Sequence, residues 1–363
     1  PEALASTASV TFQVTDTHPD VSIAQIAPGA AGDPAGPNKP SGFRITFAEA
    51  IDPASFDASD LSLGTSTAAG AALGALAPVT PGLVYTVPVT ALGDGTITLT
   101  MAADAACAAG HYSVACDAGY GSAAPTYADN AITWDQTTPK PTIGVKAGQA
   151  NPTNGATVLF EVDAGETFSS APASFDGADI DLIASTATTG SATVTWQGAG
   201  SPSKFTVSVP VSTSGNVVAK VKAGAYADTA LNPNDASGTA TVTVDVTPPT
   251  VTIEQAVGQS DPASVGPIHF TAVFSEPVTG FATGDVSVSG TAGATAALVT
   301  EIAPNDGTTY DVAVSNMAGS GTVIASVPPG VAVDGVQNAN LASTSSDHTV
   351  TYSLAPQMSV EGN

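Results

Sequence analysis

The stretch Phe281-Ala-Thr-Gly-Asp285-Val286 decides the fold, because its pattern of Phe, three residues, Asp and an aliphatic residue recurs along the chain. The other two copies span Phe56 to Leu61 and Phe175 to Ile180. Chance would rarely place three such motifs at the same point of a longer repeated pattern. A period close to the size of a domain indicates a tandem array of similar units.

The segments around each motif alternate apolar and polar residues with period two, as in Phe205-Thr-Val-Ser-Val209 and Tyr310-Asp-Val-Ala-Val314. Gly, Pro, Asn or Asp bound these segments, and no convincing amphipathic helix appears, so we expect strands throughout. About seven short strands in roughly 110 residues need a facing sheet to cover their apolar sides. The pattern therefore predicts an all-β fold of tandem two-sheet sandwiches.

The spacing of the repeats predicts the domain organisation. We expect domains at residues 20–138, 139–248 and 249–353. Residues 1–19 match the closing strand and linker of a preceding repeat, and residues 354–363 match a linker and the start of a following one. A lone strand leaves its backbone groups unpaired. We therefore expect either a longer repeat protein or terminal strands that pair with neighbouring copies.

Composition restricts the partners of this chain. Its 363 residues include 7 Lys and Arg against 32 Asp and Glu, a net charge of −25. This charge argues against nucleic acid and anionic membrane surfaces as partners, because phosphate binding needs clustered basic residues. No apolar run of about 18 residues marks a membrane span. An acidic, Lys-poor chain with one close cysteine pair is typical of an extracellular or cell-surface protein.

The reactive side chains do not form a recognisable catalytic motif. The four histidines fall at unrelated positions of the repeats, and no nucleophile elbow, phosphate loop or zinc motif occurs, so we predict no enzyme activity. Cys107 and Cys116 lie in an insertion of the first repeat and predict a disulfide that restrains it. A catalytic or metal-binding pair is the alternative reading.

Acidic residues recur at positions that the strand order brings together. If the first strand runs away from the linker and the second returns, the loop after the second strand lies beside the linker. The loop before the last strand lies there too. The candidate ligands are Asp16, Glu49, Asp60, Asp129 and Asn130 in the first unit, Asp135, Glu166, Asp179, Asp228 and Asn232 in the second, and Asp245, Glu276, Asp285, Asp334 and Asn338 in the third.

Such clustered carboxylates repel one another unless a cation neutralises them. Carboxylate and amide oxygens without His or Cys favour calcium, which takes six to eight oxygen ligands, so we predict structural calcium at the domain junctions. Asp and Asn also cap turns through their own backbone, which is the alternative. The second unit fits least well: Glu166 follows its strand two residues later than Glu49 or Glu276, and Asp163 competes with it.

Three features together resemble a known family. The linker from Val246 to Ile253, the segment from Phe274 to Phe281 and the Asp-x-x-x-Asn loop are similar to the bacterial immunoglobulin-like (Big-type) repeats of large cell-surface and adhesin proteins. The resemblance covers residues 20 to 353. It implies immunoglobulin-like β-sandwich domains in an elongated extracellular rod, often rigidified by calcium.

We therefore expect a non-enzymatic extracellular structural protein that serves as a stalk or spacer of a bacterial surface protein or adhesin. Its partners would be neighbouring copies or adjacent repeats of a longer chain, without nucleic acid or membrane insertion. One alternative is a self-assembling surface-layer, sheath or fibre subunit linked by strand exchange. Another is a carbohydrate- or receptor-binding module or an accessory array of a secreted enzyme, with Tyr112 and Tyr120 as anchors.

Overall fold

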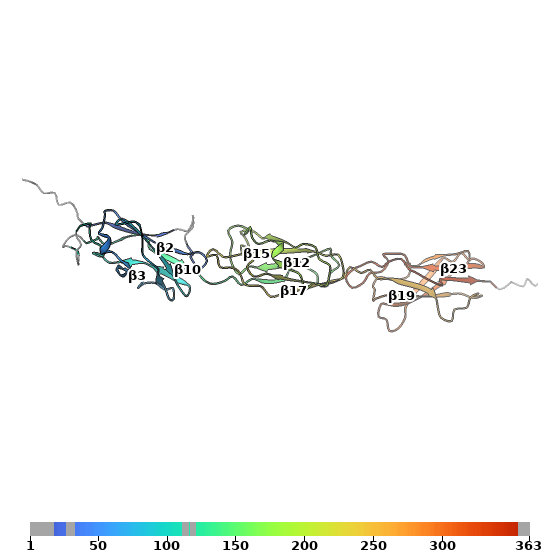
Figure 1. The fold of residues 1–363 in the computed structure, drawn as a ribbon. Coiled ribbons are helices and arrows are strands. Elements are labelled where there is room, and N and C mark those ends of the chain that lie inside the picture. Colours follow the sequence, from blue (N-terminus) through green and yellow to red (C-terminus); the bar gives the residue numbers. More distant parts are fainter. Residues whose placement is uncertain (1–17, 27–32, 111–115, 117–120, 355–363) are drawn as a thin grey trace, which may run out of the picture.

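The computed structural model describes residues 18–26, 33–110, 116 and 121–354. The terminal strands expected within 1–17 and 355–363, and the side chains of Tyr112 and Tyr120, lie outside these residues. Three β-rich bodies follow one another end to end along an elongated molecule (Figure 1). We refer to residues 20–138, 139–248 and 249–353 as domains 1, 2 and 3. Each sheet takes all its strands from one of these ranges.

Domain 2 shows the strand arrangement most simply. One sheet has the order β11-β12-β15-β14 and the other has the order β13-β16-β17, with antiparallel neighbours throughout. The strands are β11 (Thr142–Val145), β12 (Thr157–Asp163), β13 (Ile180–Asp181), β14 (Thr193–Trp196), β15 (Lys204–Pro210), β16 (Gly215–Val221) and β17 (Ala240–Val244). Lettered in chain order, these are the ABED and CFG sheets of a constant-type immunoglobulin domain. The predicted tandem immunoglobulin-like sandwich is thus confirmed.

Domain 3 repeats this topology with the orders β18-β19-β22-β21 and β20-β23-β24. Its strands are β18 (Val251–Gln255), β19 (Ile268–Phe274), β20 (Ser287–Ser289), β21 (Ala296–Glu301), β22 (Thr309–Ser315), β23 (Gly321–Ser326) and β24 (Thr349–Tyr352). The two domains therefore place equivalent residues at equivalent points, which allows their junctions to be compared residue by residue.

Domain 1 has the same plan with additions. Its strands are β1 (Val21–Ile26), β2 (Ser41–Phe47), β3 (Leu61–Ser62), β4 (Ala72–Leu73), β5 (Ala77–Thr80), β6 (Val84–Thr90), β7 (Gly95–Thr98), β8 (Thr100–Met101), β9 (Thr126–Asp129) and β10 (Ala131–Trp134). The fourth and sixth strands of the plan are each split in two, and β9 adds a parallel neighbour to β1. The structure joins Cys107 and Cys116 in a disulfide, with their Cα atoms 5.4 Å apart.

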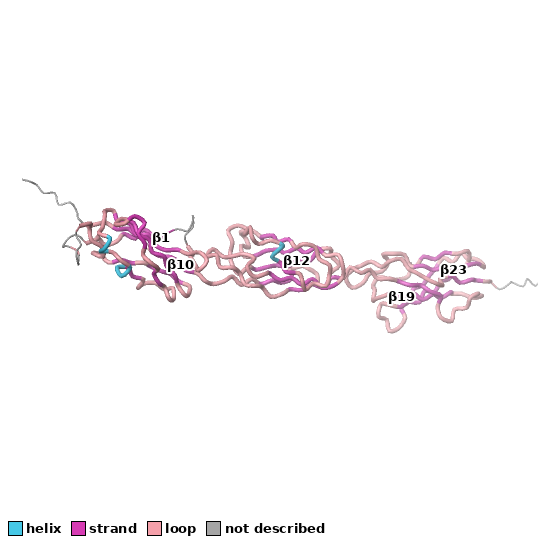
Figure 2. The backbone as a smooth tube through the Cα atoms, viewed as in Figure 1, coloured by secondary structure: helices cyan, strands magenta, loops and turns pink. Residues whose placement is uncertain are grey.

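Helical structure is confined to short turns, as the cyan segments of Figure 2 show. The described residues contain no α-helix, only the 3-10 turns η1 (Pro53–Ser55), η2 (Ala58–Asp60) and η3 (Gly177–Asp179). None of the helical segments in this part of the chain is long and apolar enough to cross a membrane.

The repeated Phe anchors the core of each domain. Phe56, Phe175 and Phe281 are buried. Each ring packs edge-on against an aromatic ring of the fifth strand of the plan, Tyr85, Phe205 or Tyr310, with centroids 5.0 Å apart in all three domains. Edge-to-face contacts of this kind stabilise a core beyond the area they bury. The repetition of the Phe therefore reflects packing between the two sheets.

The repeated Asp of the motif closes the turn that leads into the third strand. Its carboxylate accepts a hydrogen bond from the N–H three residues earlier in each copy, over 2.8 Å at Asp60, 3.0 Å at Asp179 and 2.7 Å at Asp285. This is the returning half of a capping box. These three predicted ligands are hydrogen-bonded within their own turns, which is the turn-capping alternative raised by the sequence.

Candidate metal centre

Three carboxylates meet at the junction of domains 2 and 3. Asp245 follows β17, Glu276 follows β19, and Asp334 lies in the loop before the last strand of domain 3. One carboxylate oxygen from each lies within 4.8 Å of the others, and within the described residues no other group of three or more His, Cys, Asp or Glu approaches so closely. Asp334 is 2% exposed, whereas Asp245 and Glu276 are half-buried.

Asn338 ties this loop to the linker. Its backbone N–H and its side-chain amide donate to the two oxygens of Asp334, each over 2.8 Å. The same side-chain amide donates to the backbone carbonyl of Asp245 over 2.9 Å. We call this last bond, from the loop Asn of one domain to the linker Asp carbonyl of the domain before it, the Asn lock. It fixes the linker against the face of the following domain.

The junction of domains 1 and 2 repeats the arrangement. Asn232 donates to Asp228 through its backbone N–H over 2.9 Å and its side-chain amide over 3.0 Å. The amide also donates to the backbone carbonyl of Asp135 over 3.0 Å, so this junction has an Asn lock as well. Lys39 of domain 1 adds a contact, because its ammonium donates to the carbonyl of Thr229 over 3.1 Å.

The register of β12 explains the apparent displacement of Glu166. Ile143 pairs with Val162 as Ile253 pairs with Ala272, so Ala164 occupies the place of Phe274. Glu166, two residues beyond Ala164, is therefore the structural equivalent of Glu276. The sequence-based expectation of a shifted acidic loop in domain 2 is corrected: β12 and β19 share one register, and Glu166 and Glu276 occupy equivalent positions after them.

Two neighbours of Ala164 differ from their counterparts in domain 3. Asp163, the competing ligand expected from the sequence, accepts from the N–H of Gly165 over 3.2 Å and pairs with Lys204 over 3.1 Å. Phe168 supplies the aromatic ring that Ala164 lacks, packing edge-on against Phe205 at 5.8 Å. Asp163 is thus engaged in its own domain.

One glutamate at each junction lies close to two other carboxylates. Burial raises the pKa of Glu276, and the charges of Asp334 and Asp245 raise it further. Burial likewise raises the pKa of Glu166, with added repulsion from Asp228 and Asp135. In the described part of the chain, no Lys, Arg or His forms a salt bridge with the cluster at the second junction. A hard divalent cation with oxygen ligands fits such a donor set.

Domain 1 does not build the same site at its N-terminal face. Asp129 lies in β9 beside Ala24 and is exposed, and the Asn130 amide donates to the carbonyl of Leu99 over 2.9 Å. Asp129 therefore belongs to the strand along β1, and Asn130 lies between β9 and β10 with its amide bound within domain 1. Glu49 is exposed.

The loop of domain 1 has a different composition at the equivalent point. Ala106 donates its N–H to Ser122 as Ala332 does to Asn340. Two residues further on, domain 1 has Ala108 where domain 3 has Asp334. The disulfide-closed insertion thus replaces the Asp-x-x-x-Asn loop, a difference visible only once the hydrogen bonds align the repeats.

The linker Asp predicted before domain 1, Asp16, lies outside the described residues, but its spacing in the sequence can be compared. Pro19, Pro139 and Pro249 are equivalent, because each carbonyl accepts from the segment before the last strand of its domain. Four residues before Pro139 and Pro249 are Asp135 and Asp245, and four residues before Pro19 is Thr15. In the sequence, Asp16 therefore precedes its proline by three residues, one fewer than Asp135 and Asp245 do.

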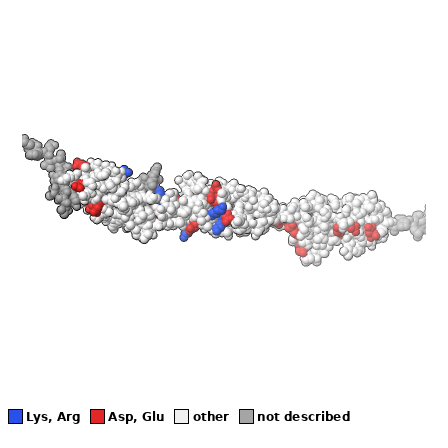
Figure 3. All heavy atoms as spheres, viewed as in Figure 1, with Lys and Arg blue, Asp and Glu red and all other residues white. Residues whose placement is uncertain are grey.

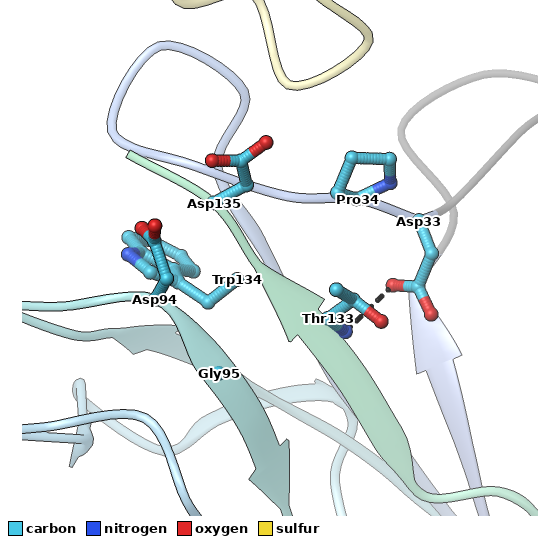
Figure 4. A pocket seen from close by; sticks show the side chains of 7 residues that line it. All are labelled: Asp33, Pro34, Asp94, Gly95, Thr133, Trp134 and Asp135. Atoms are coloured by element: carbon cyan, nitrogen blue, oxygen red, sulfur yellow. Dashed lines mark hydrogen bonds between the residues drawn. The ribbon is translucent and has the colours of Figure 1, made fainter. Parts of the chain in front are cut away.

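A shallow cavity of about 370 Å³ lies where the linker leaves domain 1, and Figure 4 shows Asp94 and Asp135 beside the ring of Trp134. The Asp94 carboxylate accepts from the N–H of Gln136 over 2.7 Å and from the hydroxyl of Thr137. The buried Trp134 indole N–H has no partner among the described residues. The polar groups of this cavity hold the linker, as Ser214 does in domain 2 through the N–H of Val246 over 3.0 Å.

Charge is distributed unevenly along the rod. Figure 3 shows acidic atoms near the boundary of domains 2 and 3, and basic atoms on domains 1 and 2 alone in that view. All seven Lys and Arg precede residue 223, so the sequence of domain 3 contains none. Domain 3 therefore brings no basic side chain to the second junction, whereas Lys39 of domain 1 contacts a backbone carbonyl at the first.

Comparisons with known proteins find only weak likenesses, all of them to solved structures. No protein-family model and no curated protein matches the sequence. Among solved structures, the Escherichia coli adhesin FdeC is 13% identical and covers 95% of this chain and 100% of its own, with a TM-score of 0.35. A marsupial T cell receptor is 9% identical over 85% and 96%, with a TM-score of 0.31. Domains 4–9 of the surface layer protein SbsC are 15% identical over 93% and 48%, with a TM-score of 0.27. Likenesses this weak do not bear on what the chain does.

Glu276→Gln is expected to stabilise the metal-free junction slightly, because it removes a carboxylate whose pKa is raised by burial and by its acidic neighbours. A raised folded-state pKa means that stability is lost as pH rises through it. The advantage of the variant over the wild type should therefore shrink as pH falls through this raised pKa toward the ordinary 4.5. Thermal unfolding in chelator from pH 7 down to pH 4.5 measures it. An advantage that does not change with pH would contradict the cause assigned here.

Proposed function

We propose that this chain is a non-enzymatic extracellular structural protein. It would serve as a stalk or spacer that keeps the groups attached at its two ends a fixed distance apart. The observation that carries the proposal is the Asn lock, which occurs with equivalent residues at both internal junctions. Tandem domains move relative to one another unless their interface restrains them. A hydrogen bond from the loop of one domain to the linker of the domain before it is such a restraint.

Calcium would strengthen the restraint. At the second junction Asp245, Glu276 and Asp334 would hold the ion, and at the first junction Asp135, Glu166 and Asp228 would do so. Their oxygens come from the linker of one domain and from two loops of the next, so one ion would join three segments of two domains. The ion would remove the repulsion among the carboxylates. The chain's own contribution is to bring these oxygens together and to hold the buried Asp of each loop through the adjacent Asn.

The alternatives depend on segments that are not described. Strand exchange between copies would use residues 1–17 or 355–363, and a binding tip in the insertion would use residues 111–115 and 117–120. Both stay predictions. The rod, by contrast, rests on hydrogen bonds within the described residues.

Asn338→Ala is expected to loosen the second junction, because it removes the Asn lock and leaves the Asp245 carbonyl without that donor. Spin labels at Ile183 of domain 2 and Val257 of domain 3, which are 92% and 106% exposed, report the junction through their distance distribution. We expect this distribution to widen in the variant, with a loss of stability of about 1 kcal/mol.

The matched control uses labels at Leu92 and Ile183, which span the first junction and are both exposed. Their distribution should not change in Asn338→Ala. A wild-type distribution across the second junction that is already as broad as that of the variant would reject the rigid-spacer function.

A further inference from the structure

Each junction is built from two half-sites on successive domains. The preceding domain supplies a linker Asp directly after its last strand. The following domain supplies Glu two residues after the register position of Phe274 and the Asp-x-x-x-Asn loop. The Asn lock and the carboxylate cluster both need the two halves together, so the composition of each half-site decides which domains can be joined in this way.

The half-site after domain 3 lacks the Asp. The residue after the last strand donates its N–H to the equivalent carbonyl in all three domains, Asp135 to Ala35, Asp245 to Thr153 and Ser353 to Ala263, over 2.8 Å each. Ser353 therefore occupies the position of Asp135 and Asp245. Its hydroxyl carries no charge, so it cannot take the place of the carboxylate in the cluster.

On the N-terminal face of domain 1, the described residues have Ala in place of the loop Asp. The hydrogen bonds of Ala106 and Ser122 place Ala108 at the position of Asp228 and Asp334. Between these anchors the chain continues into the insertion closed by the disulfide of Cys107 and Cys116. Ala108 has no side-chain oxygen to orient a loop Asn or to join the cluster.

We infer that the three domains form one rigid segment whose two internal junctions are locked and whose two ends cannot be locked in the same way. This rests on the proposed spacer function and limits the rigid part of the spacer to the three domains. It also means that the end of domain 3 and the face of domain 1 do not form this junction with each other. Copies of the chain, or further domains placed next to it, would articulate at Ser353 and at the N-terminal face of domain 1.

A tandem of two copies tests this directly. Residues 1–353 of the first copy are followed by residues 16–363 of the second, so that the linker between Ser353 and Pro19 has the length found after Asp135 and Asp245. Electron microscopy of single molecules in millimolar calcium gives the angle at every joint. We expect the joint between the copies to show an angular spread roughly twofold wider, or more, than the joints within each copy.

A second tandem keeps the inference falsifiable. It carries Ser353→Asp in the first copy and has residues 107–121 of the second copy replaced by residues 333–339 of domain 3. This restores both half-sites, and the middle joint should become as narrow as the internal ones. Melting curves of both tandems check that all domains fold.

The outcomes separate the two proposals. Narrow internal joints with an equally narrow middle joint in the first tandem would overturn the inference while leaving the spacer function intact. A middle joint that stays wide after restoration would also overturn it. Wide internal joints would overturn the spacer function itself, and the rigid segment with it.

Discussion

Calcium is expected to raise the midpoint of thermal unfolding of this chain by about 10 °C. A ligand that binds only the folded state at about 100 times its Kd stabilises by about 2.7 kcal/mol, and extracellular calcium sites have Kd values of about 10⁻⁴–10⁻³ M. For a domain of roughly 110 residues, each kcal/mol shifts the midpoint by about 4 °C. Scanning calorimetry with about 10 mM calcium, and again with chelator, measures the shift.

The carboxylates at the junctions should account for this response. We expect the double variant Asp245→Asn and Glu276→Gln to lose the calcium shift at the second junction, because two of the three close carboxylates are gone. Asp285→Asn is the matched control: it makes the same chemical change at a carboxylate that caps its own turn. This control should lower the midpoint and keep the calcium shift. A full shift in the double variant would place the ion elsewhere.

Phe281→Ala is expected to destabilise domain 3 by about 3–5 kcal/mol, the usual cost of removing a large core side chain. Phe281 is 7% exposed, and its ring contacts both Phe274 and Tyr310 at centroid distances of 5.1 and 5.0 Å. The cavity would lie between the two sheets, where the neighbouring rings cannot close it. Unfolding by denaturant, followed separately for each domain, should show an early transition for domain 3 alone.

The control for this variant is Leu298→Ala, which removes an apolar side chain of the same domain that is 59% exposed. It should change stability by no more than about 0.5 kcal/mol. An equal loss in both variants would mean that the repeated Phe has no special place in the core. Earlier unfolding of domains 1 and 2 in Phe281→Ala would show that the sandwiches do not unfold independently.

The sequence pattern predicted the acidic cluster of domain 3 correctly in part, but not that of domain 1. Strand order brings the linker Asp and two loops to one end of each sandwich, which is why Asp245, Glu276 and Asp334 were expected to meet. The same reasoning could not assign the loop of domain 1. Asp129 and Asn130 precede the last strand, yet Asp129 pairs along β1 and the Asn130 amide donates to Leu99, because the equivalent loop lies earlier in the sequence. The number of residues before a strand therefore does not identify equivalent positions when an insertion is present. The hydrogen-bonded pairing of the strands does.

The Asn lock is the residue role that spacing alone did not reveal. Asn232 and Asn338 were expected as calcium ligands. The structure shows that their amides bind the loop Asp and the backbone carbonyl of the linker. The repeated Asp-x-x-x-Asn spacing was the available signal. The amide of each Asn donates to a backbone carbonyl 97 or 93 residues away in the sequence. Every residue has such a carbonyl, so the acceptor cannot be recognised from the residue type.

By itself the sequence determined that this protein is a row of three immunoglobulin-like sandwiches with acids gathered at the linker ends. Period-two alternation, turn residues and the repeated Phe are local properties, and each domain repeats them. Only the tertiary structure decided which acids meet. A carboxylate that caps its own turn and one that faces a linker occupy the same kind of sequence position, and they are distinguished by the register of strands and by backbone hydrogen bonds between distant segments.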